Sequence, residues 1–86
     1  MTDQEIIAAA NAALAEEFEL ELSEMVPEAR FDDDLNLDSL DAVDMVIVLE
    51  QTFGIKLRDS EAIREIRTLD DLYRFLIAKK AELAGA

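Results

Sequence analysis

One serine occupies the position in this sequence where chemistry is most expected. Ser39 lies between Asp38 and Leu40 at a predicted helix start, and no basic residue occurs between Phe31 and Lys56. A serine hydroxyl is a weak nucleophile unless a base activates it, and the chain contains neither His nor Cys. We therefore interpret Ser39 as a residue that another enzyme modifies, and we expect no catalytic activity from the chain itself.

Three roles for Ser39 are open on the residues alone. Its hydroxyl, or the carboxylate of Asp38, can cap a helix by accepting a hydrogen bond from a free backbone N–H. A helix N-terminus also favours a phosphate, so phosphorylation is a second role, although the surrounding carboxylates oppose it. The third role is the attachment of a prosthetic group through a phosphodiester.

The acids before Ser39 raise the separate possibility of a calcium loop. Asp, Asp, Asn and Asp stand at alternate positions from residue 32 to residue 38. An EF-hand loop that begins at Asp32 requires Gly at its sixth position and Glu at its twelfth. Those positions hold Leu37 and Val43, so the pattern predicts no metal site.

The helix that presents Ser39 is predicted to run from Ser39 to Phe53, with Gly54 as its C-terminal stop. A surface helix needs one apolar stripe, yet this one is apolar around most of its circumference. We assign one face to the core, namely Ala42, Met45, Val46, Leu49 and Phe53.

A second stripe on the same helix remains outside the core. It consists of Leu40, Val43 and Ile47, and Asp41, Asp44 and Gln51 lie beside it. An exposed apolar patch that carboxylates surround usually marks a partner site. The alternative is that a neighbouring loop or a dimer covers the stripe.

Further helices are predicted before and after this one. The first begins at Thr2, which forms a capping-box pattern with Glu5, and the last is capped by Thr68. A short helix is expected around residues 59–65. The buried stripes are Ile6, Ala10, Leu14 and Phe18 in the first helix, and Leu69, Leu72, Phe75 and Leu76 in the last.

A long connection over residues 19–37 joins the first helix to the helix of Ser39. Pro27 excludes a continuous helix there, and a connection of this length inside a small domain is often functional. Its apolar residues predict that it packs across the helices. They are Leu20, Leu22, Met25, Val26, Ala29, Phe31 and Leu35.

Composition predicts one small all-α domain over residues 1–86. Apolar residues make up 51% of the chain, while two Gly and one Pro leave little turn chemistry for β-hairpins. We expect a small four-helix bundle of three main helices and one short helix, with a long first loop. The N-terminus has no signal-peptide pattern and no apolar stretch approaches the roughly 20 residues that span a bilayer, so we expect a soluble, cytoplasmic chain without membrane insertion.

The charge is large and unevenly placed. The net charge is −13; residues 1–50 hold fifteen acids and one base, Arg30, whereas residues 51–86 hold six acids and seven bases. Phosphates would be repelled, so nucleic acid is excluded as a partner. The acidic part is expected to attract basic protein surfaces, the alternative being a solvated face that only keeps the chain soluble.

A series of short motifs combines these features. It comprises Phe31-x-Asp33-Asp34-Leu35, Asp38-Ser39-Leu40-Asp41, Val43-Asp44-Met45-Val46, Leu49-Glu50 and Phe53-Gly54-Ile55. With the Ile66-x-Thr68-Leu69 element that opens the last helix, the series resembles the acyl carrier protein family over nearly the whole chain. An Asp-Ser-Leu triplet alone occurs by chance, whereas the whole series at these spacings is specific.

The resemblance implies a chemistry for Ser39. A phosphopantetheinyl transferase would esterify its hydroxyl with 4′-phosphopantetheine from coenzyme A, and Asp38 and Leu40 complete the attachment motif. The thiol of this arm would hold acyl intermediates as thioesters and carry them between the enzymes of a fatty-acid, lipid or polyketide-type pathway. Members of the family shelter the acyl chain between their helices.

The resemblance also implies a partner face on the helix of Ser39 in a monomeric carrier. Acyl-transfer or synthase enzymes would dock there with basic surfaces. The residues of this face are Asp38, Leu40, Asp41, Val43, Asp44, Ile47 and Glu50.

Some residues depart from the family pattern. Asn36 and Leu37 stand where Gly and Ala are common, and Asn tolerates the positive φ that such a turn requires. Gln51 replaces a common acid. The segment after the helix of Ser39 is more basic than is typical, which indicates a specialised carrier with its own partners; the bases are Lys56, Arg58, Arg64 and Arg67.

Two alternatives complete the prediction. Among carriers, a D-alanyl-type aminoacyl carrier shares the acidity and the motif, while peptidyl carriers usually have a Gly-Gly-x-Ser approach and fewer acids. Outside the carriers, an unmodified acidic helical interaction domain would use the same helix, and Ser39 would then be only a cap.

Overall fold

Three α-helices and one 3-10 helix form the described part of the chain, which in this computed structural model comprises residues 2–57, 63 and 65–84. They are α1 (Asp3–Phe18), η1 (Leu22–Glu24), α2 (Ser39–Phe53) and α3 (Leu69–Ala84). These residues include no strand, only an isolated bridge between Arg30 and Thr68. The predicted all-α class is confirmed, while most of the short helix expected at 59–65 lies outside the described residues.

The helices begin and end at the residues that their local caps specify. The Thr2 hydroxyl accepts a hydrogen bond from the Glu5 N–H (3.2 Å), and the Glu5 carboxylate accepts one from the Thr2 N–H (2.8 Å), as the capping-box pattern predicted. α2 ends at Gly54, whose φ is +65°. α1 ends without Gly, because Glu19 itself adopts the left-handed conformation with φ +54°.

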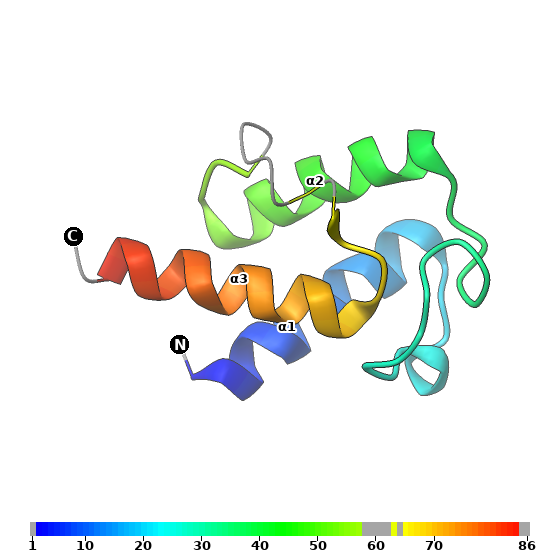
Figure 1. Ribbon diagram of the computed structural model, residues 1–86, viewed down its shortest axis with the longest axis horizontal. Coiled ribbons are helices and arrows are strands. Elements are labelled where there is room, and N and C mark those ends of the chain that lie inside the picture. The colour runs from blue at the N-terminus through cyan, green and yellow to red at the C-terminus, as the bar shows by residue number, and fades with distance from the viewer. Residues whose placement is uncertain (1, 58–62, 64, 85–86) are drawn as a thin grey trace.

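The packing leaves a gap between two of the helices. α1 contacts both α2 and α3, as Figure 1 shows. In the part of the chain that the structure describes, no Cα atom of α2 lies within 8 Å of one in α3. Side chains from both helices, among them Met45 of α2 and Phe75 of α3, line a cavity. The residues of the predicted buried stripes are buried or packed against the core. Tyr73 is also buried, although the prediction did not include it in the core. The Tyr73 hydroxyl donates a hydrogen bond to Asn11 Oδ1 (2.6 Å) and so joins α3 to α1.

The connection between α1 and α2 packs as predicted at five of the seven apolar residues that the prediction named. Met25, Ala29, Phe31 and Leu35 are buried and Leu20 packs against the core, whereas Leu22 and Val26 are 62% and 46% exposed. The prediction that these last two anchor the connection is wrong. The turn of η1 and the turn closed by the Ala29 N–H on the Val26 carbonyl direct Met25 and Ala29 inward, and they leave the side chains of Leu22 and Val26 in solvent.

Backbone hydrogen bonds fasten this connection to the start of α3. The Phe31 N–H donates to the Arg67 carbonyl (3.1 Å), the Leu69 N–H to the Ala29 carbonyl (3.0 Å) and the Asp70 N–H to the Pro27 carbonyl (2.9 Å). Segments some 40 residues apart in sequence therefore hold each other in place. The hydrogen bonds thus hold residues 27–31, which precede the turn into α2, against the start of α3.

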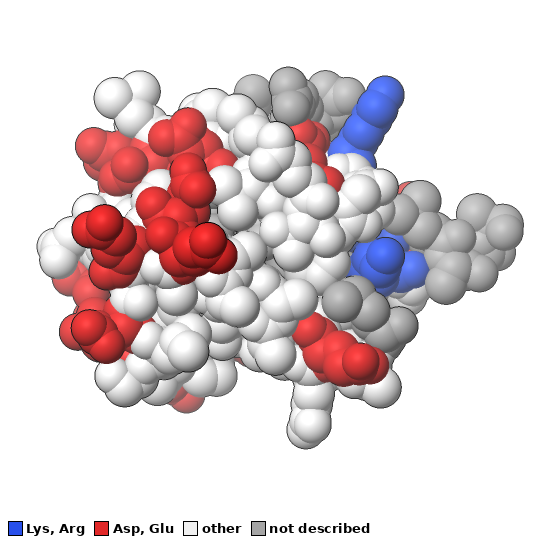
Figure 2. Space-filling model, turned by 180° about the vertical axis from the view of Figure 1, so that it is seen from behind, with Lys and Arg blue, Asp and Glu red and all other residues white. Residues whose placement is uncertain are grey.

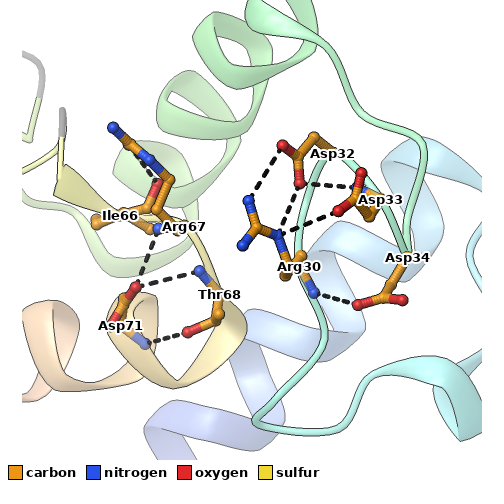
Figure 3. A network of polar contacts seen from close by, with 8 residues as sticks. All are labelled: Arg30, Asp32, Asp33, Asp34, Ile66, Arg67, Thr68 and Asp71. Atoms are coloured by element: carbon orange, nitrogen blue, oxygen red, sulfur yellow. Dashed lines mark hydrogen bonds and ion pairs between the residues drawn. The ribbon is translucent and has the colours of Figure 1, made fainter.

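The first turn of α3 is capped reciprocally, and this cap predicts a pH dependence of stability. The Asp71 Oδ2 atom accepts hydrogen bonds from the N–H groups of Arg67 (3.0 Å) and Thr68 (3.2 Å), as Figure 3 shows. The bond from Arg67 is the main reason why the pKa of Asp71 lies below its usual value. A lowered pKa stabilises the fold above the unfolded pKa of about 3.9, and this contribution is lost as the pH falls through the folded pKa.

We therefore expect Asp71→Asn to be less stable than the parent at pH 7, with a difference that shrinks as the pH falls below about 4. Urea unfolding of both chains across that range measures the difference. Tyr73→Phe, which removes a hydrogen bond of a group that does not titrate in this range, provides a control with a constant difference. If the difference in stability between the parent and Asp71→Asn stayed constant down to the lowest pH, the Asp71 carboxylate would not act through its charge.

Candidate functional site

The start of α2 is capped by Asp38 and leaves Ser39 without a structural task. The Asp38 Oδ1 atom accepts hydrogen bonds from the N–H groups of Leu40 and Asp41, both at 3.0 Å, and the Asp41 Oδ2 atom accepts one from the Asp38 N–H (3.1 Å). Of the two capping groups that the sequence offered, the carboxylate of Asp38 is the one used. Ser39 is the first residue of the helix proper.

The side chain of Ser39 is exposed, and its hydroxyl makes no hydrogen bond to any residue that the structure describes. No His or Cys occurs in the chain to activate it. The group is thus accessible to an external enzyme and lacks the means to react by itself.

The turn before α2 is held by its own backbone and by one arginine. The Leu37 N–H donates to the Phe31 carbonyl (2.8 Å), and Asn36 adopts φ +57°, the left-handed conformation predicted for it. The guanidinium of Arg30 lies 3.3 Å from an oxygen of Asp32 and 3.4 Å from one of Asp33 (Figure 3). Its hydrogen bond lowers the pKa of Asp32. The one base of residues 1–50 is therefore engaged within an acidic turn.

A mostly apolar cavity opens beside Ser39. Its volume is about 320 Å³, and it occupies the space between α2 and α3 that the backbone packing leaves open. Ser39, Asp38, Asp32 and Arg67 supply the polar part of its lining. The apolar lining consists of Phe31, Leu37, Ala42, Met45, Val46, Leu49, Leu57, Ile63, Ile66, Leu72 and Phe75.

The second stripe of α2 is exposed, as its sequence indicated. Leu40 is 77% exposed, Val43 58% and Ile47 37%. Val43 and Ile47 line a shallow groove of about 250 Å³ together with Ala42, Val46 and Ile63. The fold therefore leaves a large part of each of these three side chains exposed.

The acids assigned to the partner face differ in how they are used. Asp44 is exposed, and its carboxylate has no hydrogen bond or ion pair with a described residue. Asp41 takes part in the cap, and the Glu50 Oε2 atom accepts a hydrogen bond from the Leu57 N–H (2.8 Å), which holds the turn after α2. Asp44 is thus the acid of this face that has no structural task among these contacts.

Two of the four remaining charged candidates, Lys56 and Arg67, lie in the described part of the chain. Lys56 is exposed, and Arg67 donates from Nη1 to the Ile66 carbonyl (3.4 Å) while it lines the cavity. Arg58 and Arg64 lie outside the described residues. Within the described residues, no group of three or more His, Cys, Asp or Glu side chains is arranged to hold a metal ion.

The sequence identified Ser39 and its helix but not every residue that completes the site. Ile63 and Ile66 line the cavity from the segment between α2 and α3, and Leu37 lines it from the turn before Ser39. Their apolar character in an otherwise polar segment was the available signal. These side chains line the cavity in a fold in which residues 27–31 pair with residues 67–70, and no local sequence pattern indicates that pairing.

Comparison with known proteins gives consistent matches. Residues 11–76 match the family described as "Phosphopantetheine attachment site". The chain is 37% identical over 81 residues to an acyl carrier protein of Thermosynechococcus vestitus, an alignment that covers 94% of this chain and 99% of that protein. It is 41% identical over 69 residues to an acyl carrier protein of Helicobacter hepaticus, with 80% and 90% covered.

Proposed function

The chain belongs to the acyl carrier protein family, and from this premise we propose that Ser39 is the residue that carries its 4′-phosphopantetheine. The observation that carries the proposal is the hydroxyl of Ser39, which is exposed, free of the cap that Asp38 provides, and next to the opening of an apolar cavity. Loading with coenzyme A by a phosphopantetheinyl transferase, read out by intact mass, tests it.

Attachment needs little from the chain beyond presentation. The Ser39 oxygen forms a bond to the phosphorus of the phosphopantetheine half of coenzyme A, and its proton passes to a base of the transferase. The bond between that phosphorus and the bridging oxygen of the pyrophosphate breaks, and adenosine 3′,5′-bisphosphate leaves. The chain contains no Cys, so the arm supplies the thiol that holds an acyl group as a thioester. The chain acts as a carrier, and the bond-making steps belong to the enzymes that it visits.

The cavity is the proposed shelter for the acyl chain. Ser39 is one of its lining residues, and most of the lining is apolar, so a hydrocarbon chain that enters from the arm leaves water. Both named relatives are acyl carrier proteins, which supports an acyl cargo over an aminoacyl one. We assign the carrier to fatty-acid, lipid or polyketide-type synthesis.

The exposed stripe of α2 is the proposed docking face for the transferase and for acyl-transfer or synthase enzymes. Leu40, Val43 and Ile47 provide apolar contact, and Asp44 provides a charge that a basic partner surface attracts. A partner of this face therefore needs an apolar centre with Lys or Arg around it.

None of the described helices is long and apolar enough to cross a membrane.

We expect Asp44→Lys to raise the KM of a phosphopantetheinyl transferase for the carrier by about tenfold and to leave kcat within about twofold, because a charge at the rim of an interface mainly changes encounter and its salt dependence. Glu82→Lys, on α3, is the matched control, since it makes the same change of charge at an exposed residue remote from the stripe in sequence. Loading rates against carrier concentration, at low and at about 0.15 M salt, measure the effect. Equal KM values for the two variants would exclude Asp44 from the docking face.

A further inference from the structure

The connection between α1 and α2 carries a second exposed apolar surface, separate from the stripe of α2. Leu22 is 62% exposed and Val26 46%, although both are apolar residues of a segment that otherwise packs inward. Val26 lines a groove of about 340 Å³ with Glu24, Glu28, Ala29 and Asp34. We call the groove residues Glu24, Val26, Glu28 and Asp34, together with Leu22 four positions before Val26 in the chain, the loop surface. None of these five residues lines the groove on α2.

The exposure of Leu22 and Val26 does not result from a loose segment. Met25 and Ala29, which flank Val26, are buried at 6% and 3% exposure, and Leu20, two residues before Leu22, packs against the core. The Met25 N–H bonds the Leu22 carbonyl (3.1 Å), the Ala29 N–H bonds the Val26 carbonyl (3.0 Å), and the pairing with the start of α3 holds the following residues. The backbone that carries Leu22 and Val26 is therefore held in place by buried neighbours and hydrogen bonds, while the two side chains point into solvent.

The charged residues that line the groove beside Val26 are all acidic. The side chains of Glu24 and Glu28 make no hydrogen bond or ion pair with a described residue, and Arg30, the nearest base in sequence, is engaged by Asp32 and Asp33. Figure 2 shows that Asp and Glu side chains gather over the end of the molecule that holds this connection in Figure 1. In that view, Lys and Arg side chains lie toward the opposite end.

From these observations we infer that the loop surface is a second docking site, for a protein whose contact surface presents an apolar side chain surrounded by Lys or Arg. The apolar centre would cover Leu22 and Val26, and the basic rim would neutralise Glu24 and Glu28, which the chain itself leaves unpaired among its described residues. Phosphate-rich partners are excluded by the same negative charge. The site does not depend on the role of Ser39, because it needs neither the arm nor α2.

The experiment uses a probe of this chemistry and the whole chain. A synthetic amphipathic peptide of about 18 residues, long enough to form a helix, carries Leu on one face and Lys on the other. It is titrated into the ¹⁵N-labelled chain at about 0.15 M salt, where charges further apart than about 8 Å are screened. We expect saturable shifts of the amides of residues 20–34 in addition to any shifts on α2. Glu24→Lys with Glu28→Lys is expected to weaken binding at residues 20–34 by about tenfold and to leave the affinity at α2 unchanged.

Two controls separate a docking site from plain charge attraction. Glu65→Lys with Glu82→Lys changes the net charge equally, from −13 to −9, since each exchange adds two charges, and it is expected to retain the shifts at 20–34. Leu22→Ser with Val26→Ser leaves every charge in place and is expected to lose them. Circular dichroism verifies that each variant is folded. Shifts confined to α2, an equal loss in both double Lys variants, or full retention in the double Ser variant would each overturn the inference.

Discussion

Ser39→Ala is expected to abolish phosphopantetheine loading completely. Parent chain incubated with coenzyme A, Mg²⁺ and a broad-specificity phosphopantetheinyl transferase is expected to gain the mass of one phosphopantetheine, whereas the variant is expected to gain none. The reason is local: the Ser39 hydroxyl is the only group that changes, while the cap that positions the start of α2 is made by Asp38 and stays intact. Intact-mass spectrometry resolves the two outcomes.

Ser23→Ala is the matched control for this experiment. Ser23 is also exposed and also lies in a short helical segment, η1, so its replacement tests whether any accessible serine serves. It is expected to load like the parent. A mass gain that survives in Ser39→Ala would move the attachment to another residue, and no gain in a folded parent would favour the unmodified interaction domain over the carrier.

The elements that could be predicted from sequence are those whose signals are local. α2 begins and ends where its sequence indicates, because Asp38 provides the cap within three residues and Gly54 the left-handed stop. The same holds for Thr2 with Glu5 at the start of α1 and for Thr68 with Asp71 at the start of α3. Such contacts span a few residues, so the sequence alone determines them.

The connection shows where that reasoning ends. Leu22 and Val26 have the same apolar character as Met25 and Ala29, yet only the latter pair is buried. The difference arises from two tight turns and from hydrogen bonds to residues about 40 positions away, which local pattern does not encode. Glu19 likewise ends α1 in a conformation for which Gly or Asn is the usual choice, and no residue type marked that position.

The candidate site divides in the same way. The exposure of Leu40, Val43 and Ile47 follows from counting apolar positions around α2, since one helix cannot bury its whole circumference against two neighbours. The cavity beside Ser39 follows instead from the distance between α2 and α3, which α1 sets by packing against both. A property of three helices together cannot be read from any one of them.

That cavity leads to a large expected change in stability. Parent carrier whose arm holds an octanoyl group is expected to be more stable than the unacylated carrier by up to about 5 kcal/mol, because six sheltered methylenes contribute up to about 0.8 kcal/mol each. The gain is expected to rise with chain length and to level off once the cavity of about 320 Å³ is filled. Like a ligand that binds only the folded state, an acyl group that is sheltered only in the folded carrier raises the free energy of unfolding of the carrier. Urea unfolding of carriers with acetyl, butyryl, hexanoyl and octanoyl groups measures this gain.

Ala42→Leu is expected to remove a large part of this chain-length dependence. Ala42 is the smallest residue of the cavity lining and stands on α2 between the cavity and the outer groove, so three added carbons occupy space that the acyl chain would use. Ala12→Leu makes the same change at an exposed residue of α1 that lines neither, and it is expected to keep the full dependence. Each variant is loaded and its mass verified before unfolding, so that a docking defect is not mistaken for a filled cavity. Equal stability of acetyl and octanoyl carriers in the parent would place the acyl chain in solvent, and an unchanged dependence in Ala42→Leu would place it elsewhere on the protein.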